Sequence, residues 1–253
     1  MKVTFLGTGT SQGVPVIACE CEVCRSSDSR DNRLRCSVLI SDTQGNLLID
    51  TGPDFRQQIL RENIKHLDAV LFTHEHKDHI AGLDDIRAFN YFQRKHMDIY
   101  LSEHVETALR REFAYIFAKN KYPGIPLINL HRINLNPFKL LGHQITPIEV
   151  SHYLMPVFGF KIDSFCYVTD AKSIAESELT KMKNAKVLVL NALRKETHVS
   201  HFTLKEALEV IDYVKPEKAY LTHLSHQMGL HAEVEKELPK NVFLAYDGLK
   251  IDI

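Results

Sequence analysis

The stretch Thr73-His74-Glu75-His76-Lys77-Asp78-His79 places three imidazoles and a carboxylate within six residues. It follows the apolar run 68–72, which is typical of a buried strand. The first two histidines alternate, so both can face one metal ion in an extended turn, while the aspartate and the third histidine can reach a second ion. Neutral imidazole and carboxylate favour zinc, manganese or iron over calcium. The stretch therefore predicts a metal site, rather than a polar loop that is rich in histidine by chance.

The composition is that of an ordinary globular protein. The chain has 253 residues, of which 44 % are hydrophobic and 25 % charged, and no repeat or linker marks a boundary, so we predict one domain over residues 1–253. The formal net charge of −1 lacks the basic excess typical of a protein that binds long nucleic acid. The start is too short an apolar run for a signal peptide and no segment reaches transmembrane length, so we expect no membrane partner and a cytoplasmic location.

Short apolar runs alternate with amphipathic segments in the first half of the chain. The helix predicted at 54–63 would place Phe55, Ile59 and Leu60 on one side. A later helix begins at the capping box Thr203-Leu204-Lys205-Glu206, and His201 lies just before it. In the first half we predict strands at residues 2–6, 36–41, 46–50 and 99–101, helices at 54–63, 84–94 and 103–118, and a loop at 120–126.

A polar residue follows each of the predicted strands in the second half of the chain. In the second half, strands at 144–150, 165–169, 186–190 and 218–222 lead to His152, Asp170, Asn191 and His223. Open sheets build functional sites in this way, along one edge. Asp50 ends an earlier apolar strand, where we expect it to organise the histidine turn by hydrogen bonds rather than to bind metal.

The segment Cys19-Glu20-Cys21-Glu22-Val23-Cys24 holds three of the five cysteines. Three thiols at this spacing favour a structural zinc site, whose fourth ligand must come from elsewhere. A redox pair and plain buried cysteines are the alternatives. The odd number of cysteines does not make a disulfide framework, which indicates a reducing, intracellular setting.

The first strand leads into the glycine-rich loop Gly7-Thr8-Gly9-Thr10-Ser11-Gln12-Gly13. It is not a Walker sequence and no helical pattern follows it, so it resembles a phosphate cradle only loosely. We favour the other interpretation, a tight turn that lets the backbone pass close to the metal centre.

The H-x-H-x-D-H stretch, followed by single His, Asp and His at strand ends, resembles the metallo-β-lactamase superfamily over nearly the whole chain. The resemblance implies a layered α/β fold, the four-layer αβ/βα sandwich, with two divalent metals along one edge. Zinc, manganese and iron all fit the ligands. The implied ligands are His74, His76 and His152 for one ion and Asp78, His79 and His223 for the other, with Asp170 as the bridge.

The segment 7–15, the cysteine cluster and Leu221-Thr222-His223-Leu224-Ser225-His226-Gln227 are together similar to the PhnP-type cyclic phosphodiesterases of phosphonate breakdown, which are related to tRNase Z. This resemblance implies that Cys19, Cys21, Cys24 and His226 bind a structural zinc. It implies that His201 assists catalysis, with His198 as the nearby competitor. The candidate catalytic residues are therefore His201 and Asp78.

The implied reaction is hydrolysis of a small cyclic or nucleotide-like phosphodiester by a hydroxide that bridges two metals. The alternatives are a tRNase Z-like nuclease, disfavoured by the balanced charge and the lack of an RNA-gripping arm, and a thioester, lactone or lactam hydrolase, disfavoured by the subgroup motifs. A redox diiron protein would carry Glu in place of His76. A binding module without turnover is disfavoured by the seven intact ligands. The expected partner is a small phosphodiester. Dimers are common among such relatives, so a homodimer is the alternative to a monomer that the sequence leaves open.

Overall fold

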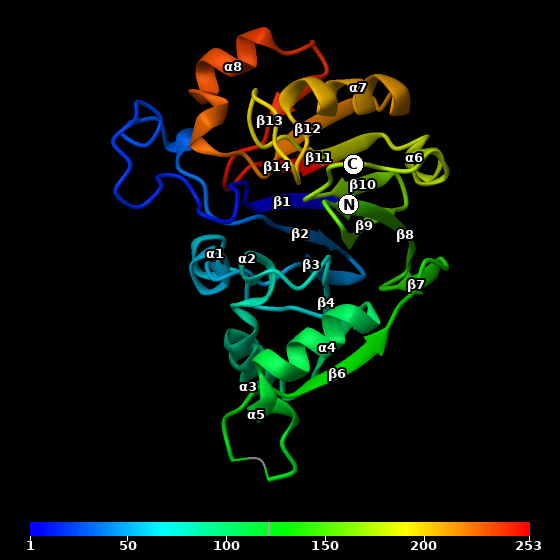
Figure 1. Ribbon diagram of the computed structural model, residues 1–253. Helices are drawn as coiled ribbons and strands as arrows, with labels where there is room; N and C mark the ends of the chain where they lie inside the picture. Colours follow the sequence, from blue (N-terminus) through cyan, green and yellow to red (C-terminus); the bar gives the residue numbers. More distant parts are fainter. Residues whose placement is uncertain (121) are drawn as a thin grey trace.

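The computed structural model describes residues 1–120 and 122–253, and its strands form two seven-stranded mixed sheets packed face to face (Figure 1). The first sheet has the order β14 (Lys250–Asp252), β1 (Lys2–Gly7), β2 (Ser37–Asp42), β3 (Gly45–Ile49), β4 (Ala69–Leu71), β5 (Met97–Leu101) and β6 (Ile128–Arg132). The second has the order β13 (Val242–Leu244), β12 (Lys218–Thr222), β11 (Val187–Asn191), β10 (Phe165–Val168), β9 (Met155–Ile162), β8 (His143–His152) and β7 (Phe138–Leu140).

Helices cover the outer face of each sheet (Figure 1). The first sheet carries α1 (Phe55–Arg61), α2 (Lys77–Ile80), α3 (Arg87–Gln93), α4 (Glu103–Glu112) and α5 (Ala114–Phe117), and the second carries α6 (Glu176–Met182), α7 (Leu204–Val214) and α8 (His231–Glu237). Short 3₁₀ turns are η1 (Ser29–Asp31), η2 (Leu83–Ile86) and η3 (His226–Met228). This layering confirms the predicted αβ/βα sandwich. Within the described ranges, none of the helices combines the length and the apolar character that crossing a membrane requires.

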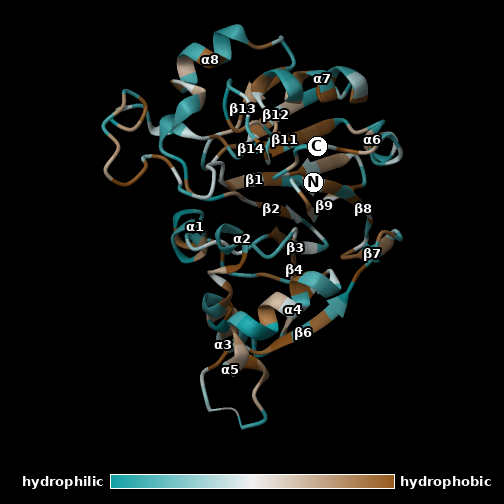
Figure 2. Ribbon diagram, in the orientation of Figure 1, coloured by the Kyte–Doolittle hydropathy of each residue, from teal (hydrophilic) through white to brown (hydrophobic). Residues whose placement is uncertain are grey.

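Three apolar layers hold the sandwich together. Successive side chains of a strand point to opposite faces, and in β2 this places Val38 and Ile40 between the sheets and Leu39 under the outer helices. Each such buried aliphatic side chain contributes about 1.5–3 kcal/mol relative to exposure. In Figure 2 apolar colour dominates the central strands, whereas the outer helices carry both polar and apolar colour.

Three sequence expectations for the first half need comment. The helix predicted at 103–118 is wrong as a single element, because Phe113, with φ −118° and ψ 42°, separates α4 from α5. In α1, Leu60 is 57 % exposed rather than buried. The buried position belongs to Gln58, whose Nε2 donates to the Arg35 carbonyl at 2.8 Å. Of the loop predicted at 120–126, Lys121 lies outside the described residues.

The parallel strands place the predicted polar residues at a common edge. Strands β10, β11 and β12 pair in parallel, as do β3 and β4, so the carboxyl ends within each set lie side by side. Asp170, Asn191 and His223 come at those ends in the second sheet, and Asp50 and the histidine turn come there in the first. The strand ends of the two sheets meet at this edge.

Candidate metal centre

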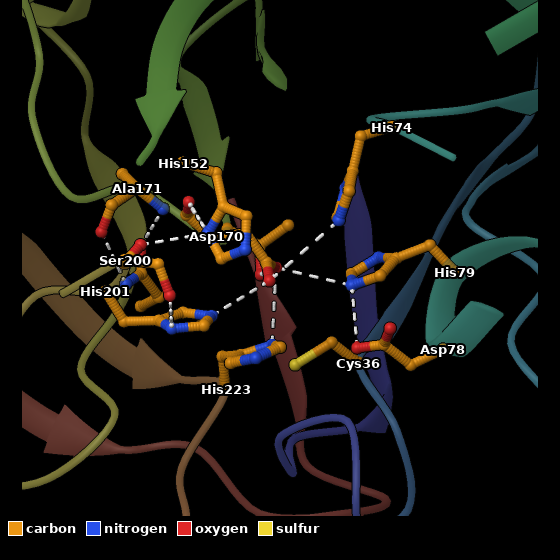
Figure 3. A network of polar contacts seen from close by, with 12 residues as sticks. Cys36, His74, Asp78, His79, His152, Asp170, Ala171, Ser200, His201 and His223 are labelled. Atoms are coloured by element: carbon orange, nitrogen blue, oxygen red, sulfur yellow. Dashed lines mark hydrogen bonds and ion pairs between the residues drawn. The ribbon is translucent and has the colours of Figure 1, made fainter. Parts of the chain in front are cut away.

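The structure brings the predicted active-site ligands together at the shared strand edge (Figure 3). The ligand atoms of Asp78, His79, Asp170 and His223 all lie within 4.8 Å of one another. The ring of His76 is centred 4.7 Å from that of His74 and 5.1 Å from that of His152. The converging residues are His74, His76, Asp78, His79, His152, Asp170 and His223.

Asp170 occupies the middle of this group (Figure 3). Its Oδ2 lies 3.3 Å from His79 Nε2 and 3.3 Å from His223 Nδ1, while its Oδ1 lies 4.0 Å from His74 Nε2. A carboxylate that faces imidazoles from both sheets has the placement that a bridging ligand requires.

Asp50 orients the histidine turn from beneath. Its Oδ2 accepts from His79 Nδ1 at 2.7 Å and from the Thr73 hydroxyl at 2.8 Å, and its Oδ1 accepts from the Thr73 N–H at 2.9 Å. The bond to Nδ1 leaves Nε2 of His79 to face the centre, as outer carboxylates do for metal-binding histidines. The expectation that Asp50 organises the turn by hydrogen bonds is confirmed.

The backbone is strained at the strand ends. Asp50, Asp170 and His223 adopt left-handed φ values of 64°, 57° and 56°. Each such conformation costs on the order of 1–3 kcal/mol for a non-glycine residue and is typical of functional sites. These residues follow the strands closely, and their backbone conformation holds the side chains at the edge.

Two glycine-containing turns pass close to the centre. A Cβ on Gly52 would lie 2.2 Å from the Asp78 carbonyl oxygen, so only glycine allows this approach. In the glycine-rich loop, Thr10 N donates to the Leu224 carbonyl at 3.1 Å, and Leu224 N donates to the Thr8 carbonyl at 2.9 Å. The loop thus supports the residue after His223, in agreement with the interpretation of a turn beside the metal centre.

The donor set fits divalent cations. Within residues 1–120 and 122–253, the buried Nε2 atoms of His74, His79 and His223 have no hydrogen-bond partner. Burial lowers the pKa of His223 to about 4, and burial together with His79 holds the pKa of His74 well below its usual range. Neutral imidazoles with unpaired nitrogens are the form that binds metal.

The carboxylates attract positive charge to the same point. Burial lowers the pKa of His79, but Asp78, Asp170 and Asp50 outweigh it and raise this pKa well above its usual value. A group of buried carboxylates that draws a proton onto an imidazole would equally stabilise a metal cation.

Backbone groups orient two further ligands. His152 Nδ1 donates to the Asp170 carbonyl at 3.0 Å and to the Ser200 carbonyl at 2.9 Å, which leaves its Nε2 free. The Asn191 amide accepts from Ala171 N at 2.7 Å and donates to the Ala171 carbonyl at 2.9 Å, so it holds the residue after Asp170 rather than facing a metal. Sequence reasoning did not single out Ser200, because a carbonyl acceptor leaves no signal in residue type.

His201 lies inside the same cluster. Its Nε2 is 3.1 Å from Asp170 Oδ1, and the ligand atoms of His152, Asp170 and His201 lie within 4.8 Å of one another. This geometry suits a proton donor at the centre and also a metal ligand. The division of ligands between two ions stays a prediction, as does the role of His201.

The second cluster joins the N-terminal loop to η3. His226 Nδ1 lies 3.3 Å from the sulfur atoms of Cys19 and Cys21 and 3.6 Å from that of Cys24. The Cys24 N–H, and next the His226 side chain, lower the pKa of Cys21 to about 6. Three thiols and one imidazole are a ligand set of structural zinc sites. The fourth ligand expected for the cysteine segment is thus in place, and zinc itself stays a prediction.

Comparison with known proteins identifies the family. A family model described as "Beta-lactamase superfamily domain" matches residues 45–224. The crystal structure of a new diphosphatase from the PhnP family is 38 % identical, with a TM-score of 0.93, over 100 % of this chain and 97 % of that one. Human tRNase Z, short form, shares the fold at 18 % identity and a TM-score of 0.76, over 100 % of this chain and 99 % of that one.

The matches to curated proteins cover only part of each relative. An octanoyltransferase of Porphyromonas gingivalis is 40 % identical over 253 residues, which are 99 % of this chain and 51 % of that protein. A coenzyme PQQ synthesis protein B of Methylobacterium nodulans is 33 % identical over 107 residues, 37 % of this chain and 36 % of that protein. The chain spans about half the length of the octanoyltransferase, and the match to the PQQ synthesis protein covers about a third of either protein. By its sequence, its fold and the geometry of its histidine turn, the chain belongs to the beta-lactamase superfamily and, within it, to the PhnP family of hydrolases.

Proposed function

We propose that this protein is a metal-dependent phosphodiesterase that hydrolyses a small cyclic or nucleotide-like phosphodiester. The observation that carries the proposal is the gathering of imidazoles from both sheets around Asp170. The 38 % identity to a PhnP-family diphosphatase supports a bond between phosphorus and oxygen as the target. A diphosphate linkage therefore belongs among the substrates to be tested.

The predicted ligands form two groups, one for each cation. His74, His76 and His152 would hold one, Asp78, His79 and His223 would hold the other, and Asp170 would contact both. Two such cations, when bound, supply Lewis acidity to a phosphoryl oxygen and lower the pKa of water. Asp50 keeps His79 in its tautomer, and the carbonyls of Asp170 and Ser200 do the same for His152.

His201 is placed to act on the leaving group. Its Nε2 faces Asp170 Oδ1, and the residue is buried, so its proton is directed into the site rather than into solvent. Proton donation to a leaving oxygen by a positioned imidazole is worth on the order of 10²–10⁴-fold. His201 would therefore matter most for substrates whose leaving group departs as a poorly stabilised alkoxide.

A second candidate is the hydrolysis of an acyl thioester. The relative that is 40 % identical over nearly the whole chain is an octanoyltransferase, although this chain spans only half of it. Tyr153 and Leu154, directly after the predicted ligand His152, are 61 % and 83 % exposed and offer apolar surface beside the centre. An RNA-processing nuclease is less well supported, since the net charge is −1 and the tRNase Z likeness concerns the fold alone.

The test is turnover by protein loaded with zinc or manganese. The panel contains bis(p-nitrophenyl) phosphate, 2′,3′-cyclic AMP, a dinucleoside diphosphate, S-octanoyl-N-acetylcysteamine, nitrocefin and a precursor tRNA. We expect turnover of the first three probes, abolished by a chelator and restored by metal. Cleavage of the thioester alone would replace the phosphodiesterase by the second candidate, and cleavage of the tRNA alone would indicate a nuclease.

A further inference from the structure

A second histidine contacts His201 on the side away from Asp170. His198 Nδ1 lies 3.3 Å from His201 Nδ1, and the two ring centres are 5.1 Å apart. Ser200 lies between them, with its hydroxyl oxygen 3.1 Å from His201 Nδ1 and 3.3 Å from His198 Nδ1. The segment 195–202 that carries these residues contains no helix or strand, and the bridge between Arg194 and Thr203 closes it.

One contact fixes the direction of the hydrogen bonds in this group. The backbone N–H of Ser200 points at His198 Nδ1 at 3.3 Å. A backbone N–H can only donate, so His198 Nδ1 is an acceptor and carries no proton. Two facing nitrogens form a hydrogen bond only if one of them donates. The proton in the contact between His198 and His201 therefore sits on His201 Nδ1.

The placement of the protons on His201 follows from this arrangement. The Nδ1 proton is held by the lone pair of His198 and by the Ser200 hydroxyl oxygen, so Nε2 is the nitrogen whose proton can be given up inside the site. Nε2 faces Asp170 Oδ1 at 3.1 Å, and because a carboxylate oxygen only accepts, Nε2 carries a proton as well. The backbone of Ser200 thus sets His198, and His198 sets the reactive nitrogen of His201.

We propose that His198 is a positioning residue that holds His201 in the orientation and tautomer needed to protonate the leaving oxygen, with Ser200 as the connecting group. The proposal rests on the phosphodiesterase function. The sequence analysis gave His198 as the competitor of His201 for the catalytic role, whereas in this proposal His198 orients His201. A catalytic histidine oriented by a third group is a general solution, and a neutral imidazole acts here where a carboxylate often does.

The proton balance of the step is simple. The doubly protonated His201 gives its Nε2 proton to the leaving oxygen as the bond between phosphorus and that oxygen breaks and the bond to the oxygen of water forms. The Nδ1 proton stays on His201, directed at His198 and Ser200. The attacking water gives up a proton to solvent, and His201 takes one up from solvent after the product leaves, so the pair ends the cycle unchanged.

The first test reads the tautomer without any substrate. Nitrogen NMR on zinc-loaded, histidine-labelled protein, with His201 assigned by the loss of its signals in His201→Ala, should show the proton on Nδ1. His198→Asn should keep that tautomer, because the asparagine oxygen can take the place of Nδ1, and His198→Phe should lose it. A wild-type proton on Nε2 alone, or the same tautomer in His198→Phe, would overturn the proposal.

The second test uses the leaving group. In His198→Phe, kcat for 2′,3′-cyclic AMP, whose leaving group is a ribose alkoxide, should fall about 10- to 100-fold more than kcat for bis(p-nitrophenyl) phosphate, whose leaving group needs no proton. His198→Asn should recover most of the difference, with KM and metal content as in the wild type. An equal loss on both esters would contradict the pairing. If the wild type cleaves neither ester, the proposed function fails, and the tautomer measurement still decides the pairing.

Discussion

His79 Nδ1 lies 2.7 Å from Asp50 Oδ2, and both side chains are fully buried. The same carboxylate also accepts from the N–H and the hydroxyl of Thr73, so it holds the first and the last residue of the histidine turn. A single buried side chain directly after β3 thus shapes a turn that follows β4. This relationship explains why three histidines and an aspartate in a short segment can face one point.

The first prediction concerns this pair. Asp50→Asn should weaken metal binding about 10- to 100-fold. The amide has one acceptor oxygen in place of two for the hydrogen bonds from Thr73 and His79, and it no longer fixes the tautomer of His79. Competitive zinc titration measures the affinity, and Asp252→Asn, an exposed position in β14, is the control. Equal affinities in wild type and Asp50→Asn would contradict the orienting role.

The second prediction concerns the close approach at Gly52. An alanine Cβ there would lie 2.2 Å from the Asp78 carbonyl oxygen, and both partners are backbone of packed turns. Gly52→Ala should therefore lower the free energy of unfolding by about 1–3 kcal/mol, as overpacking does, and should displace the ligand Asp78. Chemical denaturation and metal content test the two effects together. A variant with unchanged stability and full metal content would contradict the prediction, because it would show that the two turns move apart without losing free energy of unfolding.

The third prediction separates the two clusters. Cys21→Ser should lower the zinc content by one ion per chain and should lower Tm, because a hydroxyl is a much weaker zinc ligand than a thiolate. The active-site metals should stay bound, since Cys21 makes no contact with their predicted ligands among the described residues. Glu20→Gln, at an exposed neighbour of Cys21, is the control. Unchanged zinc content in Cys21→Ser would count against the structural site.

The fourth prediction follows from a histidine away from both clusters. His231 Nδ1 accepts from the buried Arg33 Nη2 at 3.1 Å, and burial, with Arg33, lowers the pKa of His231. The unfolded state takes up a proton near the ordinary value of about 6.5, while the folded state stays neutral to lower pH. This group therefore adds no pH dependence well above that value.

Below it, the stability that the neutral His231 contributes should be lost at up to about 1.4 kcal/mol per pH unit, until the folded state is protonated too. His231→Asn keeps an acceptor for Arg33 but cannot be protonated. The free energy of unfolding, measured with urea from pH 7.5 down to pH 5, should therefore fall less steeply in the variant than in the wild type. The same pH dependence of this free energy in both proteins would disprove the assignment.

Much of the site could be predicted, because its residue types and their positions relative to apolar strands can be read in the sequence. The histidine turn holds four side chains in one segment, and Asp170 and His223 stand directly after apolar strands. Asp50 was predicted as an organiser for the same reason. The predicted zinc ligand His226 required the family resemblance, since it lies 202 positions from Cys24 in the chain.

The features that escaped prediction depend on exact geometry or on backbone groups. Nothing in residue type reveals that the Ser200 carbonyl orients His152, or that its N–H fixes His198. The break of the long helix at Phe113 has no proline or glycine to mark it. In α1, the adjacent apolar residues Ile59 and Leu60 point about 100° apart around the helix axis, so the sequence pattern did not decide which side of the helix is buried. In the structure Gln58 is buried, Ile59 is partly buried and Leu60 is exposed.

The last prediction concerns His76, which sits at the N-terminus of α2 and whose side chain makes no capping hydrogen bond in the described structure. Its ring faces His74 and His152, and it is less buried than His74. His76→Ala should therefore remove a metal ligand without removing a structural contact.

Turnover should fall by more than the roughly 10–100-fold that follows the loss of an outer partner, and metal content should fall with it. The Tm of the chelated protein should stay close to that of the wild type, and His96→Ala, at an exposed histidine, should change none of these quantities. Full turnover with two metals per chain in His76→Ala would remove this residue from the ligand set.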